Sequence, residues 1–330
     1  MSQIFYHEPV LASEIVAVLV RKPGIYVDGT LGGGGHSFMI LQELDAKGCL
    51  EGSLLIGIDQ DDAALKAASE KLKQYGEHTE LVKGNFCEIG EIVTKVCYKR
   101  CLQPGVSGIL LDLGVSSFQI DTPERGFSYL REGSLDMRMD TGGTRTAGDI
   151  INSFSENELA GLFFRYGEEP KSRRIARAIV AYREKNGPVT GTEELAGIIR
   201  KNMHGGEMVL KTLSRVFQAL RIEVNNELEV LRRALYDGID RLEDHGRMAV
   251  ISYHSLEDRI VKTVFAEKAS NDWGPKGVGL REPVRRGCVT LLTRKPVLPG
   301  GEEVESNPRA RSAKLRVIEK ISHGGNHDAC

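Results

Sequence analysis

The residues that could do chemistry begin with residues 26–37, near the start of the chain, which read YVDGTLGGGGHS. A short apolar strand predicted over 24–27 leads into Asp28, and four consecutive glycines follow. Because glycine has no Cβ, its backbone can adopt positive φ, and a ligand can lie against main-chain N–H groups. A helix predicted over 37–44 would point its amino terminus at that ligand. The stretch therefore predicts a ligand-binding turn after a strand, the usual crevice of an open α/β sheet.

Spacing separates the nucleotide-binding loops that could account for this stretch. The dinucleotide fingerprint GxGxxG fails in every register, because the four glycines are contiguous. The phosphate loop GxxxxGK[ST] nearly fits 30–37, but Thr30 replaces the first glycine and His36 replaces the lysine that would hold phosphate charge. What remains is a glycine loop led by Asp28, which resembles the loop of S-adenosylmethionine-binding methyltransferases. The acid could face the cationic amino-acid end of that cofactor, and the alternative is a merely flexible loop.

Composition sets wide bounds on the class of protein. The 330 residues are 41% hydrophobic, which suffices for a sizeable core and favours two domains. No apolar run approaches the roughly 20 residues of a membrane span, and the apolar stretch 9–20 has no basic leader. We therefore expect a soluble, cytoplasmic protein without a membrane partner. The six cysteines form no CxxC pair and no histidines cluster at zinc spacing, so we expect reduced thiols and no metal.

Charge is unevenly distributed along a chain whose net charge is −2. Residues 171–185 carry six basic side chains against Glu184, and residues 281–316 carry nine against four acidic ones. Arg173 and Arg177 are four residues apart and would form one stripe on a helix. Such a stripe could bind the phosphates of a nucleic acid, or it could simply be a solvated face.

Strand and helix patterns alternate after the glycine loop. A strand over 53–59 ends in Asp59, where an acid could hold ribose hydroxyls or else cap the helix predicted over 61–75. A third strand over 79–83 is followed by Phe86, which could lie against adenine or in the core. A fourth strand over 108–112 ends in Asp112. The pattern predicts an α/β, Rossmann-like sheet.

The next clear strand, over 247–253, begins about 130 residues later, whereas a crossover helix needs only about 12. We therefore predict an inserted helical domain over 126–207, within a first domain made of 1–125 and 208–330. Capping pairs predict three helix starts: Ser155 with Glu158, Thr190 with Glu193, and Ser255 with Asp258. One apolar stripe from Leu213 to Leu235 predicts the crossover helix, and 288–293 with 314–321 predict a closing antiparallel pair.

Blocks along almost the whole chain resemble the ribosomal small-subunit RNA methyltransferase H family, also called MraW. They are DGTLGGGGHS at 28–37, LDLGVSS at 111–117, RGFS at 125–128, LDMRMD at 135–140, YGEE at 166–169, FQALRI at 217–222, SYHSLEDR at 252–259 and NPRAR at 307–311. The resemblance implies a class I methyltransferase that uses S-adenosylmethionine. It also implies methylation of N4 of a cytidine in the decoding region of 16S rRNA within the small ribosomal subunit, with the helical insert recognising substrate.

The resemblance also implies which residues bind the cofactor. They are Gly34, Gly35, His36, Asp59, Phe86, Asp112 and Gln119. Two departures from the family pattern stand out, Phe118 where proline is expected and Tyr253 where phenylalanine is more usual. A proline at 118 would have fixed the path of the chain toward Gln119.

The expected chemistry is difficult because the lone pair of cytosine N4 is delocalised into the ring. Amino-methyltransferases of DNA resemble one another in a turn after the fourth strand, where an acid or asparagine is followed by two prolines and an aromatic residue. This chain has Asp112 followed by LGV instead. Our hypothesis is that Asp112, a nearby backbone carbonyl, or both orient N4 toward the methyl group. His254 could contact the base or satisfy local backbone. The His254–Ser255 pair has no GxSxG elbow, which disfavours a hydrolase.

Three rival functions remain on the sequence alone. One is methylation of another RNA, DNA or protein amine, and a second is a noncatalytic RNA-binding module whose fold the cofactor orders. An NAD-dependent enzyme is disfavoured by the missing fingerprint. The sequence leaves open the oligomeric state and the assembly state of the rRNA substrate.

Overall fold

A computed structural model describes residues 9–203, 205–274 and 281–322. The chain divides into two compact units, Met1–Gly114 with Glu229–Cys330, and Val115–Leu228. The first unit is therefore built from two separate stretches of sequence, and the second is continuous. The predicted insert, 126–207, lies within the second unit.

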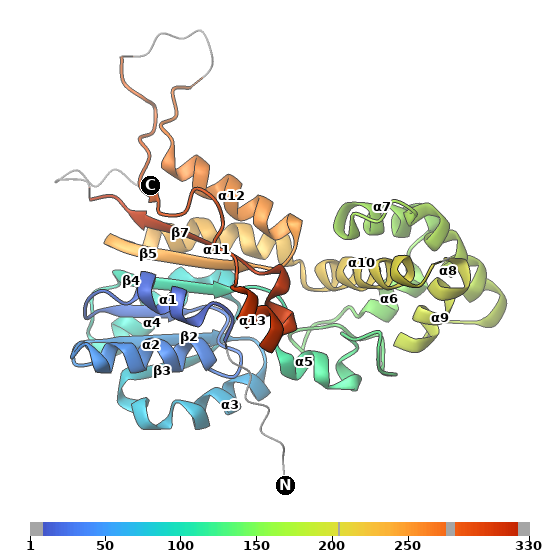
Figure 1. The fold of residues 1–330 in the computed structure, drawn as a ribbon, viewed down its shortest axis with the longest axis horizontal. Helices are drawn as coiled ribbons and strands as arrows, with labels where there is room; N and C mark the ends of the chain where they lie inside the picture. Colours follow the sequence, from blue (N-terminus) through green and yellow to red (C-terminus); the bar gives the residue numbers. More distant parts are fainter. Residues whose placement is uncertain (1–8, 204, 275–280, 323–330) are drawn as a thin grey trace. The chain divides into compact units, whose positions relative to one another are not determined.

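The first unit is organised around a seven-stranded sheet with strand order β3-β2-β1-β4-β5-β7-β6 (Figure 1). The first five strands along the sequence pair in parallel, and β7 runs antiparallel to both β5 and β6. This is the arrangement of class I S-adenosylmethionine-dependent methyltransferases, so the predicted fold class is confirmed. The strands are β1 (Ile25–Asp28), β2 (Leu54–Asp59), β3 (Thr79–Lys83), β4 (Val106–Asp112), β5 (Leu242–Ser252), β6 (Val289–Leu291) and β7 (Lys314–Lys320).

Helices cover both faces of this sheet, and its central strands are therefore buried on both sides. One face packs against α1, α2 and α3 through a core that includes Tyr26 and Leu110. On the other face α11 comes very close, since a Cβ on Gly238 would lie 2.5 Å from Met248 Cε. The helices of this unit are α1 (Ala12–Leu19), α2 (Gly35–Ala46), α3 (Asp62–Lys71), α4 (Ile89–Arg100), α11 (Glu227–Arg241), α12 (Ser255–Ala269) and α13 (Gly301–Ser306), with short 3-10 turns at η1 (Lys73–His78), η2 (Phe86–Glu88) and η4 (Pro308–Ser312).

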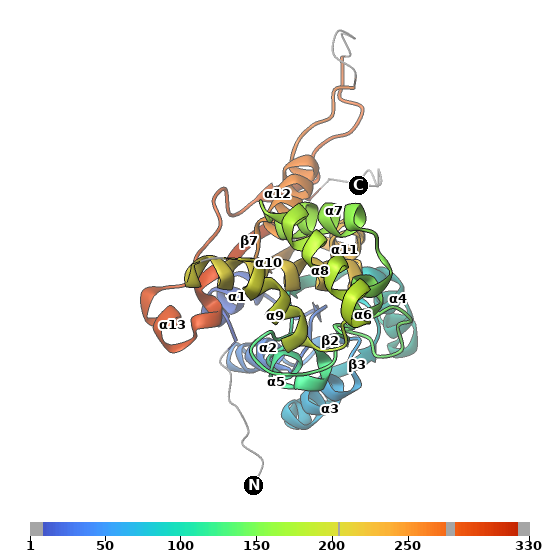
Figure 2. The ribbon, with the colours of Figure 1, turned by 90° about the vertical axis from the view of Figure 1, so that its right-hand side faces the viewer.

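The second unit is a helical bundle with its own apolar core (Figure 2). Phe163, Ile179 and Leu220 are fully buried there, from three different helices. Its helices are α5 (Ser117–Asp121), α6 (Ala147–Ser153), α7 (Glu156–Gly167), α8 (Ser172–Asn186), α9 (Thr192–Asn202) and α10 (Gly206–Asn225), with a 3-10 turn at η3 (Pro123–Arg125). Within the described part of the chain, no helix is both long and apolar enough to cross a membrane.

Two predicted helices are interrupted in the structure. The helix expected over 61–75 ends at Lys71, and a 3-10 turn follows. The single crossover helix expected from the apolar stripe is wrong: α10 and α11 are separate, and Asn226 between them has φ of 49°. Asparagine tolerates this left-handed conformation better than most residues, so it can end a helix without disturbing the apolar pattern.

Only one of the three predicted capping pairs is confirmed as written. Ser155 and Glu158 form a reciprocal capping box at α7. Thr190 instead bonds to Glu194, because α9 begins one residue later than the pattern suggested. At α12 the capping residue is His254 rather than Ser255, and its partner is Glu257.

Candidate functional site

The glycine loop joins the carboxyl end of β1 to the start of α2. Gly32 and Gly34 have φ of 49° and 76°, the left-handed region that glycine occupies without steric cost. Gly34 also packs closely, since a Cβ there would lie 3.2 Å from Ala68 Cβ. A Cβ on Gly33 would meet nothing within 4 Å, so the loop is open at that position. The loop therefore combines one tightly packed glycine with an accessible one.

Asp28 braces this loop from inside. Its side chain is 1% exposed and accepts hydrogen bonds from Ser37 Oγ at 2.7 Å and from Thr30 N at 3.1 Å. Burial raises the pKa of Asp28 above its ordinary value, and these two donors partly offset the effect. The expectation that Asp28 faces a ligand is wrong, because its carboxylate is used and covered within the loop.

Asp59 is half-buried at the end of β2 and connects that strand to the loop. Its Oδ2 accepts a hydrogen bond from Gly32 N at 2.8 Å, and its Oδ1 accepts one from Asp61 N at 2.9 Å. The cap of α3 is Asp61, which accepts from Ala63 N, so the capping alternative for Asp59 is excluded. Each carboxylate oxygen of Asp59 retains a second acceptor position. Burial raises the pKa of Asp59 as well.

Asp112, at the end of β4, is held on both of its oxygens. Tyr253 OH donates a 2.8 Å hydrogen bond to Oδ1, and His36 Nδ1 lies 3.6 Å from Oδ2. Thr30 Oγ1 accepts from the Asp112 backbone N–H at 2.6 Å. Burial raises the pKa of Asp112, against the lowering effect of His36 and Tyr253. Burial and then the Asp112 charge raise the pKa of Tyr253, so the phenol stays protonated and remains the donor.

His36 links the loop to the beginning of the described chain. Its Nε2 lies 2.9 Å from Val10 O, and because a carbonyl can only accept, Nε2 carries a proton. The next residue, Leu11, donates its backbone N–H to Glu303 Oε1 at 2.8 Å. Side chains from the loop and from α13 thus fix residues 10 and 11, and the imidazole can present only Nδ1 to Asp112.

The remaining predicted residues occupy different surroundings. Phe86 begins η2 and lies beside the loop, since a Cβ on Gly29 would be 3.1 Å from Phe86 Cβ. His254 caps α12 by accepting Glu257 N at Nδ1, and its Nε2 lies 3.0 Å from Glu257 Oε1. Gln119 belongs to the second unit, where it is buried and forms a capping box with Ser116.

The charge of this sheet edge determines what it can accept. Strands β2, β1 and β4 are neighbours in the sheet, so Asp59, Asp28 and Asp112 end next to one another. Asp28 is covered, but Asp59 and Asp112 keep acceptor positions at this edge, and their carboxylates favour a cation and disfavour a phosphate. S-adenosylmethionine, with its sulfonium and ammonium groups, fits this edge, whereas a dinucleotide's pyrophosphate does not.

Comparison with known proteins decides the family. The model of the MraW methylase family matches residues 4–321. The chain belongs to the MraW methylase family. A protein of Pelodictyon phaeoclathratiforme named ribosomal RNA small subunit methyltransferase H is 69% identical over 325 residues, 98% of each chain. One of the same name from Chlorobium phaeobacteroides (strain DSM 266) is 62% identical over 327 residues, 99% of each chain.

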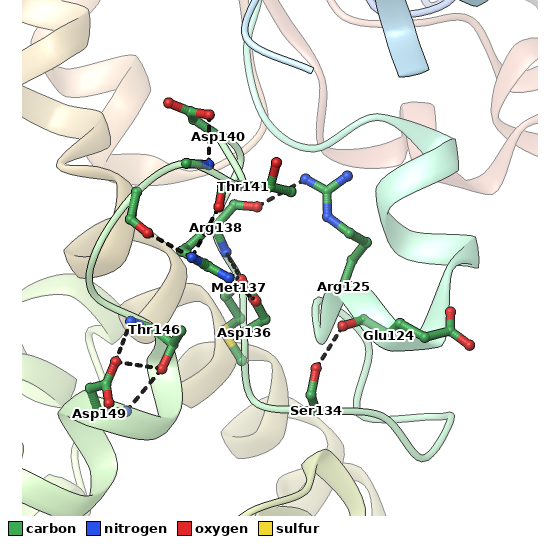
Figure 3. A network of polar contacts seen from close by, with 12 residues as sticks. Glu124, Arg125, Ser134, Asp136, Met137, Arg138, Asp140, Thr141, Thr146 and Asp149 are labelled. Atoms are coloured by element: carbon green, nitrogen blue, oxygen red, sulfur yellow. Dashed lines mark hydrogen bonds and ion pairs between the residues drawn. The ribbon is translucent and has the colours of Figure 1, made fainter. Parts of the chain in front are cut away.

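Two blocks that carry the MraW resemblance, RGFS and LDMRMD, form a polar network in the second unit (Figure 3). Arg125 Nη2 donates to the carbonyls of Arg138 and Met139 at 2.9 and 3.0 Å. Arg138 makes two hydrogen bonds to the Asp136 carboxylate, at 2.8 and 2.6 Å. Asn225 bonds to Met139 N and Met137 O, on either side of Arg138.

This network explains residues whose role spacing could not reveal. Met137, at its centre, is fully buried with φ of 58°, a conformation that a large side chain seldom adopts. Arginine and asparagine side chains bond to main-chain carbonyls around it and so hold the segment in one shape. Arg125, Asp136 and Arg138 of these two blocks therefore stabilise a loop. In the sequence, this loop is indicated only by two opposite charges, Asp136 and Arg138, spaced two residues apart.

Proposed function

We propose that this member of the MraW methylase family transfers a methyl group from S-adenosylmethionine to N4 of a cytidine in the decoding region of 16S rRNA. The observation that carries the proposal is the near-full-length relation to proteins named ribosomal RNA small subunit methyltransferase H. The acidic edge of a class I sheet supports the same cofactor. The finer choice of N4 and of the decoding region rests on the resemblance of the sequence blocks.

The cofactor is proposed to bind across the carboxyl ends of β1 to β4. Gly34 and Gly35 are proposed to bind it through their main chain, beside the open backbone of Gly33, and Asp59 can accept hydrogen bonds from ribose hydroxyls with its remaining acceptor positions. Phe86 offers an aromatic surface beside the loop for a base. His36 supports the loop from the other side. When bound, S-adenosylmethionine supplies an electrophilic methyl group on its sulfonium sulfur.

Asp112 is the residue best placed to orient the amine. Tyr253 holds its Oδ1 and His36 lies beside its Oδ2, so the carboxylate has one orientation and still has an acceptor position for an N4–H donor. Such a hydrogen bond, alone or with a nearby backbone carbonyl, directs the N4 lone pair. Correct placement of two reactants can supply about 7–11 kcal/mol of the barrier reduction. His254 is proposed to contact the base in addition to capping α12.

The substrate must be drawn out of its base stack before N4 can be reached. The helical segment 126–207 is proposed to contribute contacts to the rRNA that surrounds the base. In support, Arg173 and Arg174 are exposed on α8, and Arg177 on the same face has only an exposed partner, Glu156, at 3.3 Å. Exposed pairs of this kind are weak and can exchange for phosphate. Gln119 is proposed to bind the cofactor, as the resemblance of the sequence blocks implies.

Transfer of labelled methyl from S-adenosylmethionine to small subunits that lack N4-methylcytidine tests the proposal. Nucleoside chromatography and mapping should place the label in N4-methylcytidine at one decoding-region site. Label in another nucleoside would support methyltransferase activity but overturn N4 of cytidine as its target. Cofactor binding with no transfer to naked rRNA, assembly intermediates or mature subunits would favour a noncatalytic RNA-binding module.

The role of Asp112 is tested by Asp112→Asn, with Asp62→Asn as the matched control. Asp62 is an exposed carboxylate in the same unit that pairs with Lys83. We expect Asp112→Asn to reduce turnover strongly and Asp62→Asn to leave it unchanged. Full turnover by Asp112→Asn with unchanged cofactor affinity would falsify the catalytic role.

A further inference from the structure

A two-stranded stem, which we call the arm, leads away from the end of α12. It consists of residues 271–274 and 281–286, drawn in orange in Figure 1. Asp272 and Arg285 form an antiparallel bridge in which each backbone N–H donates to the other's carbonyl, at 2.7 and 3.3 Å. Asn271 Oδ1 accepts from Gly287 N at 2.9 Å and closes the base of the stem. The two segments of the arm are therefore joined at its base by main-chain and side-chain hydrogen bonds.

The register of this bridge gives the arm two different faces. Side chains alternate along a strand, and directly opposed residues share a face. Asp272 and Arg285 therefore share the inner face, and Arg285 Nη2 donates to Glu267 O of α12 at 2.8 Å. By the same alternation we infer that Trp273 and Val284, each next to a bridge residue, belong to the opposite, outer face. Arg286, two residues from Val284, belongs to that face as well.

The outer face is exposed and apolar at its centre. Trp273, the single tryptophan of the chain, is 52% exposed, and Val284 is 68% exposed. The Arg286 side chain is 69% exposed, and its partner Glu282 lies 3.6 Å away with 79% of its own side chain exposed. An ion pair in this much solvent contributes little, so Arg286 is available to another anion. A large aromatic residue and an arginine that are both exposed on one short arm are a feature that folding alone does not explain.

We propose that the outer face of the arm binds ribosomal RNA, with an unstacked base on Trp273 and a backbone phosphate on Arg286. The inference rests on the proposed function, which supplies RNA as the substrate class. Aromatic side chains stack on single-stranded bases, and arginine neutralises the adjoining phosphate. The surrounding sequence has the matching sign, because residues 281–316 carry nine lysines and arginines against four acidic residues.

The arm lies far from the site of methyl transfer. Helix α12 begins two residues after Tyr253, the partner of Asp112, and its 15 residues span about 22 Å before the arm starts. The arm therefore contacts RNA remote from the methylated base. Its loss should weaken binding of a large substrate and raise KM, while kcat at saturation changes little.

The test compares binding of the full-length protein to 16S rRNA and to the small subunit. The variants are Trp273→Ala, Trp273→Phe and Arg286→Glu. Matched controls are Tyr98→Ala, an aromatic 88% exposed on α4, and Lys95→Glu, which like Arg286 has an exposed i,i+4 partner, Glu91, at 3.5 Å. Affinity for S-adenosylmethionine and the melting temperature are measured alongside, because an arm contact with RNA should move neither.

We expect Trp273→Ala to weaken RNA binding roughly fivefold to 150-fold, the range measured for loss of one base–aromatic stack. Trp273→Phe should restore most of the affinity, since phenylalanine still stacks. Arg286→Glu should reduce the slope of log affinity against log salt by about one unit or more, while both controls remain at the wild-type value.

Equal RNA affinity for Trp273→Ala and Tyr98→Ala would overturn the inference. So would a loss seen on the intact subunit but not on naked rRNA, because it would assign the arm to a ribosomal protein. The proposed function fails separately, through absence of methyl transfer by the wild-type protein, while the arm is judged on binding alone.

Discussion

Alanine substitutions of two neighbouring glycines in the cofactor loop, Gly33 and Gly34, should change the stability of the protein in opposite directions. Gly34 has φ of 76°, and an added Cβ would lie 3.2 and 3.3 Å from Ala68 Cβ and Cα in α3. The left-handed conformation costs an alanine about 1–2 kcal/mol, and a helix backbone cannot easily move away. Gly33 has no left-handed φ and no atom within 4 Å of an added Cβ. Alanine there should instead stabilise by about 0.4–1 kcal/mol, because it restricts the unfolded chain.

These values predict opposite shifts in melting temperature. At about 2–4 °C per kcal/mol for a unit of this size, Gly34→Ala should unfold about 2–8 °C below the wild type and Gly33→Ala at or slightly above it. Thermal unfolding by circular dichroism measures both, and calorimetric titration with S-adenosylmethionine shows whether either affects the cofactor. Equal melting temperatures for the two variants would refute the assignment of strain to Gly34.

Three further predictions concern carboxylates. Asp59→Asn should weaken the binding of an adenosine ligand about tenfold to a hundredfold, because charged hydrogen bonds to the ribose are lost. Titration calorimetry measures this affinity, and an unchanged value would exclude the ribose contact. Tyr253→Phe removes a hydrogen-bond donor that lowers the pKa of Asp112, so the pKa of Asp112 should rise. Because the carboxylate is the active form, the acidic limb of the pH–rate profile of methyl transfer should then move to higher pH. An unmoved pH–rate profile would contradict this prediction. Burial acts to raise the pKa of Asp136, but the Arg138 hydrogen bonds outweigh it and hold that pKa below the ordinary value. Asp136 therefore stabilises above its unfolded pKa of about 4 and loses that effect as pH falls, so denaturant unfolding should show Asp136→Asn less stable at pH 7 and equal to wild type well below pH 4.

Local sequence signals identified the strands and their terminal acids because both are properties of short segments. Asp59 and Asp112 end buried strands, and parallel strands bring such residues to one edge. Whether an acid at that edge is covered or accessible depends on neighbouring elements, however. Asp28 occupies the same kind of position and is almost completely buried by the loop that follows it.

Other features depend on contacts that no short segment contains. The apolar stripe continues through Asn226, so periodicity alone could not show that the chain turns there. His254 caps α12 although serine, threonine, aspartate and asparagine are the usual capping residues. Arg125 and Asn225 meet the same loop from positions 100 residues apart, which only the folded second unit reveals.

The position of the second unit between β4 and β5 affects synthesis of the protein. On the ribosome, β1 to β4 emerge first, and the partner of the outer edge of β4 is β5, which begins only at Leu242. The continuous second unit has its whole core available before then. At roughly 5–20 residues per second, the intervening stretch of about 130 residues takes approximately 7–26 s to make. During that time an apolar strand edge remains unpaired, and such edges promote aggregation. Nascent chains that end between residues 112 and 242 therefore expose this edge of β4 until β5 has been made.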